Sequence, residues 1–349
     1  MIIHWKERIL QKFKADISLI KDVYRIKIDV PFDVKFVCCY LFKVDNFHIL
    51  YDAGLNMGNW AKQFIAQLKK INKSIADIDF CIVSHHHLDH IGLLRKFKRK
   101  NPQMKIVMGK LTDQMVKWET NPKNSDEIKQ IAKDLAEKAV KFGLTEEQGE
   151  KLVKWFTMWP KLRRYQRPDR LLKDGDMLEF GVNKIEAIWT PGHSLGHICI
   201  FDETRKYLFS GDHILSRITP HIGNFLVNPD IEVNYDFTNI LKYYLDSLDR
   251  ISELKPEIIF PAHQEVIYDP LKRITEIKEH HSQRLKQISN LIRNNPMTPL
   301  QIAMIHFGED LDEMNSYLAL SEVVAHLIYM EDQGKVERVE KDGKFFFKA

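Results

Sequence analysis

The N-terminal third of the chain is built from short apolar runs separated by polar turns. From residue 24 onwards, YRIKIDV alternates apolar and polar positions, and FVCCYLFKV and HILYDAG are nearly continuous apolar runs. Alternation predicts a half-buried β-strand, and a continuous run of this length predicts a strand covered on both faces. Residues 59–70 are spaced as in a helix, and FCIVS and KIVMG follow as short buried strands. The pattern therefore predicts a sheet whose strands are connected by helices.

The pattern changes after residue 110. Residues from 111 to about 167 are charged, rich in helix formers and without strand alternation, which predicts a helical insertion. Helical spacing appears again at residues 235–252. Strand-like runs resume at residues 177–180, 184–189, 197–201, 207–209 and 257–260. Strands on both sides of the insertion predict two sheets with helices outside them, so residues 1–272 are expected to form one α/β sandwich domain.

Residues 273–349 have a different order of elements. A long polar helix is predicted at 274–293, followed by helical runs at 299–306 and 320–330. The last residues, GKVERVEKDGKFFFKA, read as two strands joined by Asp342-Gly343, a typical hairpin turn. Three helices followed by a hairpin predict a second domain of the winged-helix type.

Composition restricts the class of protein only moderately. The 349 residues are 44% hydrophobic and 29% charged, which excludes a disordered chain, and the net charge of +4 does not require a nucleic-acid partner. The four cysteines form no CxxC pair, so buried reduced thiols and a cytoplasmic location are expected. No apolar run approaches the roughly 20 residues that span a bilayer, so no membrane partner is expected.

The segment SHHHLDHIG, residues 84–92, is the strongest chemical signal in the chain. It places four histidines and an aspartate directly after an apolar strand. Imidazole and carboxylate groups are the usual zinc ligands besides cysteine. One ion rarely takes so many ligands from one short segment, whereas two ions about 3.5–4 Å apart would use them. A two-metal site then requires further donors elsewhere in the chain.

Such donors follow other predicted strands. TPGHSLGH comes after residues 184–189, SGDH after 207–209 and PAHQ after 257–260, and YDAG has the same form near the start. Ligands at the ends of several strands are held by a rigid sheet, which fixes metal geometry. The sequence therefore predicts two divalent metal ions per chain. Zinc is expected, with manganese or iron as alternatives, because His/Asp sites suit all three.

Taken together, these motifs resemble the metallo-β-lactamase superfamily. Residues 85–90 match its HxHxDH signature, and PGH, SGD and PAH match its later elements. The resemblance covers about residues 20–270 and implies an αββα sandwich, while the tail is similar to a winged-helix unit carried by one branch. It also implies a role for each donor. His85, His87 and His193 would hold the first metal, Asp89, His90 and His263 the second, Asp212 would bridge both, and Asp52 would orient the ligating histidines from behind.

The expected reaction is hydrolysis, with a metal-bound hydroxide attacking a thioester, ester or lactone carbonyl. Asp89 and Asp212 are the predicted catalytic carboxylates. The PGHSLGHI segment is similar to glyoxalase II-type thioesterases. The insertion is expected to lie over the metals, where its tryptophan and arginine side chains would suit an anionic acyl substrate. The candidate substrate residues are Trp159, Arg163, Arg217 and His221.

Two alternatives remain at this stage. The basic run RKFKRK, residues 95–100, would suit a nuclease or phosphodiesterase acting on RNA, although such a run is usually a solvated helix face. The tail would suit a DNA-binding ligand sensor, yet its last helix, SYLALSEVVAHLIYMEDQGK, is apolar and acidic rather than basic. Nucleic acid is therefore not the expected partner, and the tail is interpreted as a packing or homodimerisation element.

Overall fold

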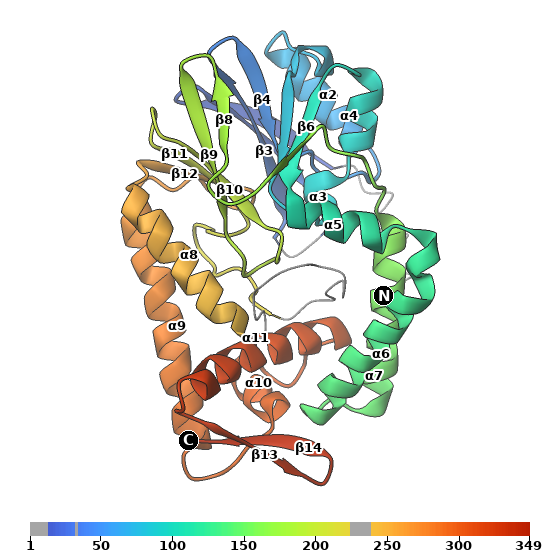
Figure 1. The fold of residues 1–349 in the computed structure, drawn as a ribbon, viewed down its shortest axis with the longest axis vertical. Coiled ribbons are helices and arrows are strands. Elements are labelled where there is room, and N and C mark those ends of the chain that lie inside the picture. Colours follow the sequence, from blue (N-terminus) through green and yellow to red (C-terminus); the bar gives the residue numbers. More distant parts are fainter. Residues whose placement is uncertain (1–12, 32–33, 224–238) are drawn as a thin grey trace.

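The computed structural model describes residues 13–31, 34–223 and 239–349, and contains two large β-sheets packed face to face (Figure 1). In spatial order, the first sheet contains β1 (Ala15–Ile20), β2 (Val23–Asp29), β3 (Phe36–Val44), β4 (Phe47–Tyr51), β5 (Phe80–Val83), β6 (Lys105–Gly109) and β7 (Arg170–Leu172). The second contains β12 (Ile258–Pro261), β11 (Tyr207–Gly211), β10 (Ile198–Asp202), β9 (Asn183–Trp189) and β8 (Met177–Phe180). Pairing is parallel from β4 to β7 and between β11 and β12, and antiparallel elsewhere in both sheets.

The sequence of strand β3 is apolar at almost every position because the strand is covered on both faces. Tyr40 and Phe42 point between the sheets, where the Phe42 ring stacks on Phe209 of β11 with centroids 4.3 Å apart. Cys39 and Leu41 point the other way, into a cluster beneath the outer helices. Successive side chains of a strand face opposite sides, so a strand covered on both faces needs apolar residues throughout. The predicted buried strand is confirmed.

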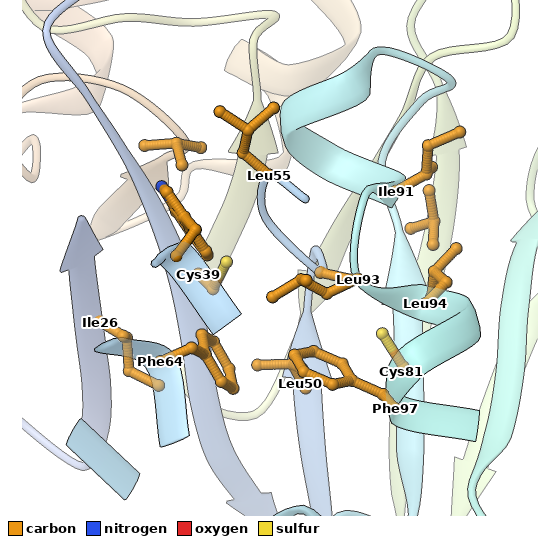
Figure 2. Packing of buried hydrophobic residues seen from close by; sticks show 14 of the residues in the cluster. Ile26, Cys39, Leu50, Leu55, Phe64, Cys81, Ile91, Leu93, Leu94 and Phe97 are labelled. Atoms are coloured by element: carbon orange, nitrogen blue, oxygen red, sulfur yellow. The ribbon is translucent and has the colours of Figure 1, made fainter. Parts of the chain in front are cut away.

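Helices cover the outer face of each sheet. On the first sheet, Phe64 of α2 (Trp60–Lys70) meets Phe97 of α4 (Leu94–Lys100) with ring centroids 4.9 Å apart (Figure 2). The second sheet is covered by α8 (Ile240–Leu254); the part of the predicted helix before residue 239 lies outside the described residues. A short η1 turn (Ile75–Asp77) precedes β5. The order helix, sheet, sheet, helix is the predicted αββα sandwich.

The predicted insertion is present between β6 and β7. It consists of α5 (Lys110–Glu119), η2 (Pro122–Asn124), α6 (Ser125–Lys141), α7 (Glu146–Met158) and η3 (Trp159–Leu162). In Figure 1 these helices run down one side of the molecule, from the edge of the sheets towards the C-terminal elements. The insertion therefore spans the distance between the sandwich and the tail.

The tail has the predicted order of elements. It contains α9 (Pro270–Ile292), α10 (Pro299–Phe307), α11 (Glu313–Asp332) and the hairpin β13 (Glu337–Lys341) and β14 (Lys344–Lys348). Asp342 and Gly343 both have positive φ, 51° and 72°, as a two-residue hairpin turn requires. The predicted domain boundary at 272/273 falls inside the first turn of α9, which runs on without a break.

The insertion and the tail share one hydrophobic core. Ala136 of α6 and Phe156 of α7 belong to the same buried cluster as Val323 and Leu327 of α11 and Phe347 of β14. Among its described side chains, α11 exposes only those at its ends, such as Asn315 and Asp332. The two segments, far apart in sequence, therefore form one packed unit below the sandwich.

Candidate metal centre

The histidine-rich segment begins where β5 ends. Ser84 to His87 form a short connection with a bend at His86 and His87, and His87, with ψ 154°, precedes the short helix α3 (Leu88–Ile91). His85 and His87 therefore lie just after the end of β5, whereas Asp89 and His90 lie in the first turn of α3. Because the chain changes from strand to helix within six residues, these two pairs of donor side chains point towards the same region of space.

The remaining predicted donors lie at the ends of strands in the second sheet. His193 follows β9, Asp212 follows β11 and His263 follows β12. The turn before Asp212 requires glycine, because Gly211 has φ +50° and a Cβ there would lie 2.5 Å from the His197 Nε2 atom. A tight backbone approach therefore places the Asp212 carboxylate.

The predicted ligands converge in space as two adjacent groups. One group is His85, His87, His193 and Asp212, the other is Asp89, His90 and His263, and the donor atoms within each lie within 4.8 Å of one another. The Asp212 carboxylate touches both groups. Its Oδ2 atom is 3.3 Å from His193 Nε2, and its Oδ1 atom is 3.4 Å from His263 Nε2. This carboxylate is therefore placed where a shared ligand of two cations would lie.

These residues fit a metal ion by their chemistry as well as their positions. His85 Nε2, His90 Nε2 and Asp212 Oδ1 are buried and have no hydrogen-bond partner within the described part of the protein. Buried polar atoms are nearly always paired, so three such atoms at one point indicate a ligand. A set of imidazole nitrogens and carboxylate oxygens is the donor set that zinc and similar divalent ions take.

Burial keeps much of the imidazole set neutral. It lowers the pKa of His85 and of His87 well below the ordinary value, so these rings are uncharged at neutral pH and each keeps a single N–H. His90 differs: burial also acts to lower its pKa, but the carboxylates of Asp212, Asp52 and Asp89 raise it well above the ordinary value. Metal ligands must be deprotonated, so a cation at this point would take the place of that proton beside the carboxylates.

Asp52 lies behind two of the predicted ligands. It is fully buried, and its Oδ2 atom is 2.8 Å from His90 Nδ1. The same carboxylate accepts hydrogen bonds from the Ser84 backbone N–H at 2.8 Å and from the Ser84 hydroxyl at 2.9 Å. The Ser84 Oγ atom is in turn 2.9 Å from His85 Nδ1. Asp52 therefore reaches His90 directly and His85 through one hydroxyl.

Backbone carbonyls hold the other imidazoles in a similar way. His263 Nδ1 is 2.7 Å from the Phe36 carbonyl oxygen, and His193 Nδ1 is 3.2 Å from the His221 carbonyl oxygen. An Nδ1–H that donates to a carbonyl leaves Nε2 as the free lone pair, directed at the cluster. Each ring is thereby fixed in the tautomer that ligation needs.

His86 and His197 stay outside both groups. His86 Nδ1 is 3.1 Å from the Ser194 hydroxyl, and its Nε2 atom is 3.8 Å from Glu119 Oε1. His197 Nε2 accepts the Asp212 backbone N–H at 3.1 Å, which supports the turn that carries this carboxylate. Of the SHHHLDHIG donors, His86 therefore points towards the insertion rather than the cluster.

A cavity of 290 Å³ opens beside the cluster. His87, Asp89 and His193 form one end of it, and the insertion and α11 form its walls. Three of the four predicted substrate residues, Trp159, Arg163 and His221, line it. Arg217 does not: its side chain is exposed, and its backbone N–H donates to Gln264 Oε1 at 2.7 Å.

Two of these predicted residues are engaged within the protein. The Arg163 guanidinium is buried in an ion pair with Glu119 at the end of α5. His221 Nε2 lies 3.1 Å from the Leu318 carbonyl oxygen and 2.8 Å from the Ser321 hydroxyl, so this loop residue joins the His193 turn to α11. Sequence reasoning did not find the cavity residues Glu119, Tyr317 and Leu318. Glu119 is one acid among many in a charged segment, and the other two lie in a helix that is apolar on nearly every face.

Residues 33–263 match the family described as the metallo-beta-lactamase superfamily. The chain belongs to that superfamily. Residues 285–349 match a second family, described as the metallo-beta-lactamase-like C-terminal domain. The protein is thus a superfamily metallo-hydrolase with His/Asp clusters able to hold metal ions. Within the described residues, no helix has both the length and the apolar character needed to cross a membrane.

Relatives extend the match over nearly the whole chain. A protein of Bacillus subtilis named "Probable metallo-hydrolase YqjP" is 26% identical over 337 residues, which cover 94% of this chain and 98% of that protein. A metallo-beta-lactamase family protein from Thermus thermophilus has the same fold, with a TM-score of 0.73 and 24% identity, covering 95% of this chain and 99% of its own. A shorter match, 48% identical over 46 residues, covers 13% of this chain and 17% of a Gallus gallus protein named "Acyl-coenzyme A thioesterase MBLAC2".

Proposed function

We propose that the protein is a dinuclear metal-dependent hydrolase that cleaves thioester or ester bonds, including lactones. The Asp212 carboxylate carries this proposal, because it contacts both groups of donors at 3.3 to 3.4 Å. His85, His87 and His193 would hold one ion, and Asp89, His90 and His263 the other. Asp212 would be shared between the two ions. Zinc is the metal we expect, with manganese or iron as alternatives.

When bound, two such ions would activate a water molecule and stabilise the oxyanion that develops at the carbonyl. The protein side chains supply the rest. Burial keeps the rings of His85 and His87 neutral, while Asp52 and the two carbonyl oxygens fix the orientation of the other imidazoles. Asp89 lines the cavity, with its Oδ2 atom 3.4 Å from His263 Nε2. A carboxylate at that position can pass a proton to the departing thiol or alcohol.

The cavity supports a carbonyl substrate over a phosphodiester. Its walls are aromatic, and within the described residues the one guanidinium that lines it, Arg163, is already paired with Glu119. A nuclease would need unpaired cations along the path of the phosphates. The basic run in α4 does not supply them at this site, because α4 packs its buried residues Leu94 and Phe97 on the first sheet. The thioesterase named among the relatives adds support from a short segment only.

DNA-binding sensing is the other candidate, and α11 gives it no support. This helix would be the recognition helix of a winged-helix unit, which must present side chains to the major groove. Instead α11 is packed against α7, α8 and α9. Tyr317, Val323 and Leu327 on it are buried. Its position supports the packing role for the tail.

The experiment that tests the proposed function uses protein loaded with zinc or manganese. Thioesters, oxyesters, lactones and phosphodiesters would be offered in parallel, before and after removal of metal with a chelator. We expect hydrolysis of a thioester or ester that disappears with the chelator and returns when metal is restored. The proposal would be contradicted if none of these substrates were cleaved, or if hydrolysis continued unchanged after the chelator was added. Cleavage of phosphodiesters alone would favour the nuclease.

The role of Asp52 can be tested separately. Asp52→Asn places an amide NH₂ at the position of Oδ2, where it cannot accept the hydrogen bonds from the Ser84 hydroxyl and His90 Nδ1. Loss of such an orienting partner typically lowers metal affinity by about 10- to 100-fold. Competition with a fluorescent zinc chelator measures this change. Asp16→Asn, at an exposed position of β1, is the matched control and should bind zinc as the parent does; equal affinity in all three proteins would show that Asp52 does not orient the ligands.

A further inference from the structure

The cavity beside the metal centre has an unusual wall. Trp155, Phe156 and Trp159 come from the insertion, and Tyr317 and Leu318 come from α11. The rings contact one another: Trp155 stacks on Trp159 with centroids 5.1 Å apart, and Phe156 meets Tyr317 edge-on at 5.3 Å. Two segments about 160 residues apart in the sequence thus build one apolar surface that faces the metal ligands.

The wall is held in place by the shared core below it. Phe156 and Tyr317 are 7% and 6% exposed and belong to the cluster that joins the insertion to the tail. His221 links its own loop to α11, because its Nε2 atom lies 2.8 Å from the Ser321 hydroxyl. A cavity whose walls are fixed in this way needs little reorganisation to receive an apolar group, which preserves affinity.

Charged groups in this cavity are already engaged. Glu119 and Arg163 form an ion pair with each other, and both are more than nine-tenths buried. Asp89 is a predicted metal ligand. A carboxylate or phosphate on the substrate would have to separate Arg163 from Glu119 and leave a buried charge unpaired, which is costly. An uncharged apolar group meets no such cost.

A second cavity, of 400 Å³, adjoins the first at His193. His193, His221 and Leu318 border both cavities, while Asp212 and His263 line only the second. Glu322 and Asn315 add a carboxylate and an amide to the otherwise largely apolar lining of this second cavity. The metal centre therefore lies between an apolar and a mixed cavity, as a substrate with two unlike parts would require.

We propose that the apolar cavity binds the aliphatic acyl chain of the substrate, with the carbonyl at the metal end and the leaving group directed to the second cavity. This assignment rests on the proposed function and names its substrate class: a thioester or ester of an uncharged fatty acid. Hydrolysis adds water across the acyl bond, so that the acid gains the oxygen and the thiol or alcohol leaves with the proton. Trp155, Phe156, Tyr317 and Leu318 then determine specificity.

The direct test is a series of thioesters that share one small thiol, from acetyl to dodecanoyl. Each buried methylene contributes about 0.8 kcal/mol, so kcat/KM should rise about fourfold per methylene until the cavity is filled. Succinyl and butyryl thioesters compare a charged with an uncharged chain of equal length, and butyryl should be preferred. A flat series, or a preference for succinyl, would overturn the assignment while leaving the hydrolase intact.

A variant that fills the cavity sharpens the test. Leu318→Trp keeps the carbonyl oxygen that contacts His221 but adds an indole to the wall. The ratio of decanoyl to acetyl kcat/KM should fall by about tenfold or more, since several methylenes lose their place. Met158→Trp, at a 44% exposed position of α7 outside the cavity lining, is the control and should keep the parent ratio. An unchanged ratio in Leu318→Trp would contradict the assignment, and the parent series decides the question if that variant does not fold.

Binding without turnover separates this inference from the proposed function. Decanamide carries the chain without a charge or a bond of the proposed class, and Trp155 and Trp159 provide a fluorescence signal inside the cavity. Metal-loaded protein should bind decanamide but not acetamide. Binding in a protein that hydrolyses no ester would support the cavity assignment and refute the hydrolase; hydrolysis without chain-dependent binding would do the reverse.

Discussion

Asp212→Ala is expected to lower bound metal from two ions per chain to one or none, and to reduce hydrolysis by about a thousandfold or more. The Asp212 carboxylate lies 3.3 Å from His193 Nε2 and 3.4 Å from His263 Nε2, so its loss removes a ligand from both groups at once. A thousandfold decrease corresponds to about 4 kcal/mol of transition-state stabilisation, which is within the several kcal/mol that bound metals supply.

Metal content after gel filtration, measured by mass spectrometry, and kcat on the accepted substrate together check this expectation. Asp246→Ala is the matched control, because this aspartate is exposed on α8 and pairs with Lys242 one turn away. It should retain both ions and full activity. Full retention of both ions by Asp212→Ala would contradict the ligand assignment.

Arg163→Met is expected to be the most destabilising of the substitutions considered. It leaves the Glu119 carboxylate, 8% exposed, without its cation. Removing one partner of a buried ion pair typically costs about 3–5 kcal/mol, because the remaining charge stays desolvated. The midpoint of urea unfolding should therefore fall markedly, with metal-loaded protein used for both parent and variant.

The double variant Glu119→Gln/Arg163→Met isolates the cause. Replacing the carboxylate by a neutral amide removes the unpaired charge, so most of the lost stability should return. If the double variant is as unstable as Arg163→Met, the loss comes from packing of the arginine stem rather than from the unpaired, buried charge of its partner. The single variant Glu119→Gln completes a double-mutant cycle, which measures the coupling free energy between the two side chains.

The sequence was sufficient for the sandwich and for the donors of the metal centre. Strands such as β3 are apolar on both faces because they are covered on both faces, and periodicity detects this directly. The donors were detectable because they follow strand ends, and because Pro or Gly turns the chain just before His193, Asp212 and His263. Strands β1 and β7 were missed for the corresponding reason: β1 has no fully buried position, and β7 has three residues, two of them exposed.

The cavity could not be predicted in the same way. An apolar helix such as α11 must be buried, but its composition does not indicate which surface buries it. Tyr317 faces the metal centre only because α11 packs against α7, a contact between residues distant in the chain. The Arg163–Glu119 ion pair could not be predicted for a similar reason, since the charged insertion contains many residues that could pair with either side chain. Whether Arg163 is available to bind a substrate anion thus depends on tertiary packing, which the local sequence pattern does not indicate.

The common interior of the insertion and the tail has a consequence for recombination between relatives. Ala136, Phe156, Val323 and Phe347 fill one volume, so substitutions in the two segments should co-vary during evolution. A chimera that imports residues 285–349 alone would bring mismatched shapes together, whereas one that also imports residues 110–162 would inherit a fitted pair. Transfer of acyl-chain preference from one homologue to another should therefore require exchange of both segments together.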